Sequence, residues 1–342
     1  MADTTDDRHV CFDALQYSNW FGVAETDAIS YHPDRDLIEQ WRRGKVDAVH
    51  VTVTLWSDAR ATMNSVMRWH RLFREHSGLV LHATSAADID LARKSDRTAV
   101  FLGFQNTSPF EDDLAMIEAF HRLGVRCAQL TYNIQNYVGS SCYEPVDTGL
   151  SRFGRLVLRE MNRVGMLIDV SHCGHRTTLD AVEHSKAPIA LTHANPLSFV
   201  KHPRAKSDEV IKAVTGRGGV IGVNAYAPLL GGTHVTLQDW AGMVARLVDM
   251  VGIAHVAIGT DTSLRWQDAD LLSMNVARWS HEANWGSNIG NKQGWSEPLS
   301  WYQTSEHFPT LVAGLEKHGF GASDVAAIVG GNWKRLFGEV IG

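Results

Sequence analysis

Two histidines and one aspartate follow apolar segments of this sequence, and their types suit metal-assisted chemistry. His172 and His193 each come directly after an apolar run, and Asp261 closes a third. Neutral imidazoles bind zinc and other borderline metals, and such a metal polarises a carbonyl group and acidifies bound water. An aspartate beside that water can act as a general base. The alternative for any one of the 17 histidines is a hydrogen-bonded structural role.

The segments that must position these residues are short, β-branched and apolar. Two of them, 165–171 and 219–223, are almost continuously apolar, which is typical of strands buried on both faces of a parallel sheet. Eight such runs are predicted strands, at intervals that leave room for a helix: His9–Gln16, Asp47–Thr54, Thr98–Asn106, Arg126–Asn133, Gly165–His172, Ala187–His193, Gly218–Tyr226 and His255–Ser263.

Helical signals fill the gaps between these runs. Apolar residues recur near a 3.6-residue period over 58–75 and 112–123, a glycine ends the helix predicted over Leu150–Val164, and Ser207 begins another. Eight strand–helix repeats predict a (β/α)8 barrel of the TIM type. An open doubly wound sheet is the alternative, but no G-x-G-x-x-G follows the first strand.

Catalytic groups of such barrels lie at the carboxyl ends of the strands. Other polar or aromatic residues also occupy these ends, among them Tyr17, Gln105, Asn106 and Tyr132. Strand-end amides such as Asn106 could orient a substrate. The segment 264–305 contains five tryptophans and follows the eighth strand, so it is expected to lie over this face as a lid or substrate wall. A dimer contact or plain packing is the alternative. The absence of a linker predicts one domain over 1–342.

Composition excludes several classes of protein. With a net charge of −6, the chain lacks the excess of positive charge that is typical of nucleic-acid-binding proteins. No apolar run approaches the length of a membrane span. The first residues have neither a basic nor an apolar leader region, and the four cysteines form no C-x-x-C pair. We therefore expect a cytoplasmic protein with reduced thiols that acts on a small molecule.

Several blocks of the chain together resemble the membrane (renal-type) dipeptidase family of metallopeptidases, which have an amidohydrolase-like barrel. The resemblance extends over nearly the whole chain, and it depends on these blocks: Gly165–His172, Leu191–Pro196, His202–Arg204 with Asp208, Gly218–Asn224, Gly259–Asp261 and Gly330–Leu336. It implies that His172 and His193 bind zinc, that Asp261 serves the catalytic water and that Arg204 holds the substrate carboxylate. It also implies a homodimer, because the family often dimerises.

The chain departs from the family pattern at the other zinc ligands. The family's His-x-Asp pair after the first strand falls on Leu15 and Tyr17, its bridging glutamate on Gln105, and a substrate-contacting histidine on Tyr132. A leucine cannot bind a metal, and two divalent ions without an anionic bridge repel each other strongly. The usual two-metal site is therefore not expected here.

Three interpretations remain open. In the first, His172 and His193 hold one zinc ion, with Gln105 or Asp261 and a water completing the shell, and the protein hydrolyses a C–N bond in a carboxylate-bearing substrate. In the second, the more apolar pocket performs lyase or isomerase chemistry on a substrate that is not a peptide. In the third, the chain is a metal-free binding protein.

Overall fold

Eight parallel strands form a nearly closed barrel in the computed structural model of the chain, which describes residues 8–17, 34–263 and 298–342. The barrel strands are β1 (Phe12–Tyr17), β2 (Ala48–Thr54), β4 (Thr98–Phe104), β5 (Val125–Gln129), β6 (Leu167–Asp169), β7 (Ala190–Ala194), β8 (Val220–Val223) and β9 (Val256–Ile258). They pair in this order. The short β10 (Thr262–Ser263) follows β9 and pairs with β1, so the last strand returns to the first. The predicted barrel is confirmed.

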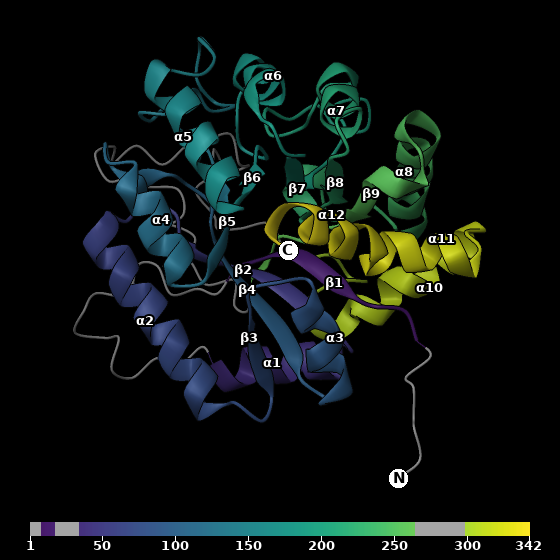
Figure 1. Cartoon of the computed structure of the whole chain (residues 1–342). Coiled ribbons are helices and arrows are strands. Elements are labelled where there is room, and N and C mark those ends of the chain that lie inside the picture. Colours follow the sequence, from purple (N-terminus) through teal and green to yellow (C-terminus); the bar gives the residue numbers. More distant parts are fainter. Residues whose placement is uncertain (1–7, 18–33, 264–297) are drawn as a thin grey trace, which may run out of the picture.

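Helices surround the strands, as Figure 1 shows. Those described are α1 (Asp34–Arg43), α2 (Ala59–Glu75), α3 (Ala87–Lys94), α4 (Ala115–Arg122), α5 (Arg152–Val164), α6 (His175–His184), α7 (Asp208–Thr215), α8 (Leu237–Val251), α10 (Phe308–His318), α11 (Ala322–Ala326) and α12 (Asn332–Ile341). Their ends follow the local signals. The hydroxyl of Ser151 accepts from the Gly154 amide at the start of α5, and Gly165, with φ 75°, ends it. Ser207 caps α7 in the same way.

The sequence analysis missed one strand, β3 (Val80–Ala83). It pairs with the first half of β4, and β5 takes the second half of the same edge. The strand β3 therefore lies beside the barrel and is not one of its eight strands. Its four residues include His82, which breaks the apolar run. Such a short segment carries little periodic signal.

The helix α12 closes the amino-terminal end of the barrel, and it crosses the centre of the view in Figure 1. The Phe337 ring packs edge-on against Phe12 and Phe101, with ring centroids 4.9 and 4.8 Å away. The Trp333 indole donates a hydrogen bond to the Ile258 carbonyl at 2.8 Å. Because this end is filled by apolar side chains, the carboxyl ends of the strands form the face at which chemistry can occur.

The Trp-rich segment is only partly described. Trp266, Trp279, Trp285 and Trp295 lie outside the described residues, so the predicted position of 264–297 over the barrel stays a prediction. Trp301 is described, and its Nε1 donates to the Val235 carbonyl at 2.8 Å. None of the helices in the described ranges is both long and apolar enough to cross a membrane.

Two glycines let β8 and β9 approach the strand that carries His193. A Cβ built on Gly222 or on Gly259 would overlap the carbonyl oxygen of Thr192. This oxygen belongs to the backbone and cannot move without shifting β7. We predict that Gly259→Ala lowers the free energy of unfolding by about 2 kcal/mol or more, as measured by urea denaturation.

The matched control for this substitution is Gly78→Ala, because a Cβ at Gly78 meets no atom within 4 Å. This control is expected to change stability by less than about 1 kcal/mol. Equal effects of the two substitutions would show that the close approach at Thr192 does not constrain the barrel.

Candidate metal and substrate site

The two histidines that were predicted to act together face each other at the carboxyl end of the barrel. His172 follows β6 and His193 lies in β7, and their Nε2 atoms are 3.0 Å apart. Both side chains are buried, with 6% and 0% of their surfaces exposed. The adjacent strands β6 and β7 thus bring together two residues separated by 21 positions in the chain.

The hydrogen bonds of the other ring nitrogens assign the protons. The Thr192 hydroxyl donates to the carboxylate of Asp169 at 2.6 Å, so it accepts from Nδ1 of His193, 2.8 Å away. Nδ1 of His172 donates to Oδ1 of Asn133 at 2.6 Å. A neutral imidazole carries one proton. In both rings that proton is on Nδ1, so two Nε2 lone pairs point toward each other.

Both imidazoles are kept neutral. Burial lowers the pKa of His172 and of His193 well below the usual value, and the positive charge of Arg204 lowers them further. Arg204 is itself buried, and its guanidinium donates to the backbone carbonyls of Ser171 and His193. The paired nitrogens are therefore available as ligands at neutral pH, because a metal binds the unprotonated ring.

This arrangement fits one metal ion and not two. Two imidazole nitrogens on a tetrahedral zinc, each bound at about 2.0–2.1 Å, lie about 3.3 Å apart, close to the observed 3.0 Å. Each ring donates its other N–H to an oxygen, which is the usual support for a metal-binding histidine. Within the described ranges, however, no group of three or more His, Cys, Asp or Glu side chains could hold a metal. A metal here needs further ligands of another type.

Asp261, the predicted base, is fixed at the end of the eighth barrel strand. Its Oδ2 accepts from Nδ2 of Asn224 at 3.1 Å, and its amide donates to the Leu15 carbonyl at 3.2 Å. The preceding residue is held by Asp13, whose carboxylate accepts from the Thr260 amide at 2.8 Å and from its hydroxyl at 2.5 Å. Asp13 thus has a structural role in this face of the barrel.

The electrostatic surroundings of Asp261 suit a base. Burial raises the pKa of this carboxyl to about 7, while Arg204 and the hydrogen bond from Asn224 act in the opposite direction. The charge of Asp261 also raises the pKa of Tyr132, for which burial is the larger cause. A carboxyl group whose pKa lies near neutrality can accept a proton efficiently at the operating pH.

An apolar and aromatic cluster lies beside the histidine pair at the carboxyl end of the barrel. Tyr132 stacks on the ring of His172, with centroids 4.4 Å apart, and meets Trp56 edge-on at 5.0 Å. Tyr17, Leu55 and Tyr132 pack in one cluster. Leu15, which the resemblance places at a zinc-binding position, is fully buried. Tyr17 and Tyr132 therefore belong to one aromatic cluster, and Tyr132 places this cluster against the histidine pair.

Two other predicted residues, Gln105 and Asn106, end β4. Nε2 of Gln105 donates to the hydroxyl of Thr52 at 2.7 Å. Among the described residues its Oε1 has no hydrogen-bond partner, so this amide oxygen is available as an acceptor or a ligand. No hydrogen bond joins Gln105 to the histidine pair within the described ranges, and its role as a metal ligand stays a prediction. Asn106 lines a separate cavity with Asn136, to which it is hydrogen bonded at 2.8 Å.

Some residues that support the site were not anticipated. Asp169 and Thr192 orient His193, and the sequence signal for them is their place on the strands that end in the two histidines. Asn133 and Asn224 were considered as amides that orient a substrate. In the structure Asn133 accepts from His172 and Asn224 donates to Asp261.

The fold and the site together define an amidohydrolase-like barrel. The family model for membrane dipeptidases (peptidase family M19) matches residues 18–268, and the chain belongs to this family. The crystal structure of an amidohydrolase from Pseudomonas aeruginosa is 34% identical, with a TM-score of 0.88 over 98% of this chain and 97% of that one. A metallo peptidase from Rhodobacter sphaeroides shares the fold, with a TM-score of 0.78, 14% identity and coverage of 98% of this chain and 100% of that one.

Curated relatives match part of the chain. An uncharacterized dipeptidase of Schizosaccharomyces pombe is 30% identical over 210 residues, which are 59% of this chain and 50% of that protein. Dipeptidase verJ of Clonostachys rogersoniana is 30% identical over 208 residues, which are 60% of this chain and 54% of that protein. The chain therefore spans about half the length of these relatives.

Proposed function

We propose that this protein hydrolyses an amide C–N bond, as a dipeptidase does, in a small substrate that carries a carboxylate. The observation that carries the proposal is the pair of Nε2 lone pairs 3.0 Å apart on His172 and His193. Two like lone pairs repel each other unless a cation lies between them. Membership of the membrane dipeptidase family and the 34% identity to an amidohydrolase support the same reaction class.

The proposed cofactor is a single zinc ion held by His172 and His193, with Gln105 or Asp261 and a water completing its shell. When bound, this ion supplies a Lewis acid that polarises the scissile carbonyl group. A second ion is not part of the proposal, since Leu15 offers no ligand and Gln105 offers a neutral oxygen where the family has an anionic bridge. Metal dependence of this kind fits the buried, unprotonated state of both imidazoles.

The protein side chains supply proton transfer, attraction of the substrate carboxylate and the surface that contacts the rest of the substrate. Asp261 accepts the proton of the attacking water and returns it to the leaving amine. Arg204, buried next to both histidines, supplies the positive charge that attracts the substrate carboxylate. Tyr132, Tyr17 and Asn106 line the face on which the rest of the substrate lies.

The direct test is the metal content of the purified protein by elemental mass spectrometry, together with a screen of dipeptides and acyl amides. About one zinc per chain and release of a free amine are expected. No metal, even after incubation with zinc, would contradict the hydrolase mechanism and favour a binding protein. Two ions per chain would contradict the proposed single site.

A second candidate function is non-hydrolytic chemistry, such as a lyase or isomerase reaction, on a substrate that is not a peptide. The observation that favours it is the aromatic wall of Tyr17, Tyr132 and Trp56 beside the histidine pair. Product analysis separates the two functions, because only hydrolysis releases an amine and a carboxylate in equal amounts with uptake of one oxygen from labelled water.

The hydroxyl of Thr192 is predicted to support metal binding. It accepts from Nδ1 of His193 and donates to Asp169, so Thr192→Val removes the link that fixes the tautomer with almost no change of shape. We expect the zinc dissociation constant to rise about 10- to 100-fold in competition with a chromogenic chelator. The control is Thr177→Val on α6, whose hydroxyl bonds Asp147 instead. Equal affinities of the two variants would contradict the role of Thr192.

A further inference from the structure

A cavity of about 320 Å³ lies at the amino end of the barrel, away from the histidine pair. The described residues that line it come from the chain before β1, from the end of α1 with the loop to β2, and from the end of α3 with the loop to β4. Parallel barrel strands all start at one end and finish at the other. This cavity and the proposed zinc ligands are therefore on opposite faces of the barrel.

Positive charge exceeds negative charge in the lining of this cavity. Among the described residues, five basic and two acidic side chains line it: Arg8, Arg42, Lys45, Arg93, Arg97, Asp47 and Asp96. The whole chain, by contrast, has a net charge of −6. The cavity thus concentrates positive charge on an otherwise acidic protein, and such a field in a concave site attracts anions.

The two carboxylates of the lining are already paired. Arg8 donates to both oxygens of the buried Asp47, at 3.0 and 2.7 Å, and Nε of Arg93 lies 3.6 Å from the same carboxylate. Arg42 contacts the exposed Asp96 at 2.5 Å. Arg93 also donates to the carbonyl of Arg8 at 2.6 Å, which ties the chain before β1 to α3. These pairs fix the walls of the cavity and use up its negative charge.

Lys45 and Arg97 have no carboxylate partner among the described residues. They lie at the starts of neighbouring strands, because the Thr98 hydroxyl donates to the Val46 carbonyl at 3.0 Å. Nε of Arg97 donates to the Ser95 hydroxyl at 2.8 Å, which orients the guanidinium. Its Nη2 and the ammonium of Lys45 have no hydrogen-bond partner in the part of the chain that the structure describes.

Basic residues at the carboxyl end of a helix often serve only to balance the helix dipole. Arg42 and Arg93, in the last turns of α1 and α3, fit that role. Lys45 and Arg97 lie beyond the helix ends, and backbone amides of the following loops already donate to carbonyls in the last turn of both helices. The charges of Lys45 and Arg97 are therefore available to a ligand.

We propose that this cavity binds a diphosphate group, either as the free anion or as part of a small molecule such as a nucleoside diphosphate. Guanidinium groups match phosphate oxygens in a two-pronged geometry, and lysine adds a compact charge. The volume of about 320 Å³ is in the range of small-molecule sites. The surplus of positive charge favours a ligand with more than one negative charge. This site does not depend on the proposed hydrolysis.

The test is isothermal titration calorimetry of the purified protein with pyrophosphate and, separately, with ADP. The double variant Lys45→Gln with Arg97→Gln is expected to weaken binding by about tenfold or more, since it removes two charge-assisted contacts. Tighter binding of pyrophosphate than of ADP supports the free anion as the ligand, and the reverse order supports an organic diphosphate. No binding of either compound to the unaltered protein would overturn the proposal.

The matched control is Lys94→Gln with Lys317→Gln, which removes the same charge at exposed positions of α3 and α10 outside the cavity lining. It is expected to bind within about twofold of the unaltered protein, because distant surface charges are screened by salt. Equal weakening by the two double variants would show a general attraction of anions and contradict the site. Thermal unfolding verifies that each variant is folded.

Two further titrations identify where and what the protein binds. Sulfate, with its charge on one centre, is expected to bind at least about tenfold more weakly than pyrophosphate, and equal affinity would contradict a diphosphate site. A zinc ion at the histidine pair would also attract pyrophosphate, so the titration is repeated with His193→Gln. Binding that survives in His193→Gln supports the cavity, whether or not the protein is a hydrolase. Complete loss in this variant would place the binding at the histidine pair and overturn the proposal.

Discussion

Replacing Asp261 by asparagine is expected to lower kcat for amide hydrolysis by about 10²- to 10⁴-fold, with little change in KM. The substitution keeps the size of the side chain, and its Oδ1 can still accept from Asn224. It removes the only proton-accepting function of the group, so the loss falls on the transition state and not on substrate binding. Steady-state kinetics with a dipeptide substrate measure this split directly.

The matched control is Asp249→Asn, because Asp249 is an exposed residue of α8 remote from the strand ends. It is expected to leave both parameters unchanged. A kcat of Asp261→Asn within about threefold of the unaltered protein would show that another group accepts the proton.

The pH profile of the unaltered protein follows from the same carboxyl group. Asp261 must be deprotonated to act as a base, and burial raises its pKa to about 7. Activity is therefore lost as the pH falls, on a limb centred at or below pH 7, since a bound cation would lower this pKa. The limb should be absent from the residual activity of Asp261→Asn.

The barrel could be predicted because each of its strands has to bury both faces. Runs such as 165–171 and 219–223 leave no polar face for solvent, and the glycine at 165 and the serine at 207 mark helix ends by local chemistry alone. The strand β3 could not be predicted in this way, because it pairs with only the first half of β4. The strand β3 can pair with β4 only because β5 begins to pair further along the same edge of β4. This arrangement is set by tertiary structure and not by the local sequence.

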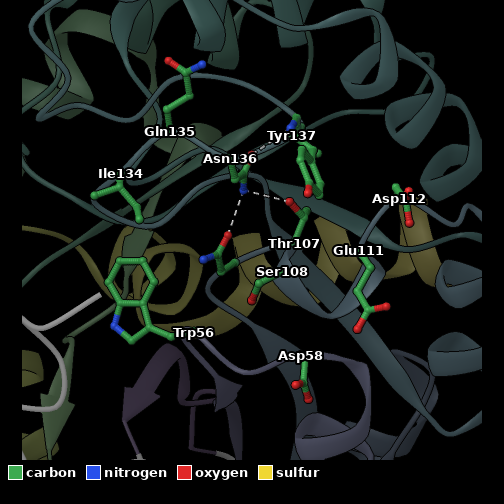
Figure 2. A pocket seen from close by; sticks show the side chains of 12 residues that line it. Trp56, Asp58, Thr107, Ser108, Glu111, Asp112, Ile134, Gln135, Asn136 and Tyr137 are labelled. Carbon is green, nitrogen blue, oxygen red and sulfur yellow. Dashed lines mark hydrogen bonds between the residues drawn. The ribbon is translucent and has the colours of Figure 1, made fainter. Parts of the chain in front are cut away.

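The position of the histidine pair was also predictable, because parallel strands end on one face. Its protonation state was not. The tautomer of His193 depends on a hydroxyl that already donates to Asp169, and that of His172 on an amide after β5. The cavity lined by Asp58, Glu111 and Asp112 (Figure 2) escaped prediction for a similar reason. Its lining comes from three loops without periodic patterns, and only folding brings these three side chains to one cavity.

Removing either imidazole of the pair is expected to abolish metal binding while the barrel persists. For His172→Gln and His193→Gln we expect zinc content to fall from about one ion per chain to less than about 0.1, because a single remaining imidazole loses the chelate. Glutamine fills most of the volume of the ring, which limits the cavity left at these buried positions. Elemental mass spectrometry gives the content, and circular dichroism with thermal unfolding shows whether the fold is kept.

The control for the pair is His82→Gln, since His82 is a partly buried imidazole on β3 that contacts the Gly124 carbonyl instead. It is expected to keep one zinc ion per chain. If both pair variants fold and still hold one ion, the metal lies elsewhere and the two lone pairs must be separated by a shared proton. If each variant loses the metal but keeps its amidase activity, the metal has a structural role and Asp261 acts without it. Loss of metal and activity together in both variants is the outcome that the geometry of His172 and His193 predicts.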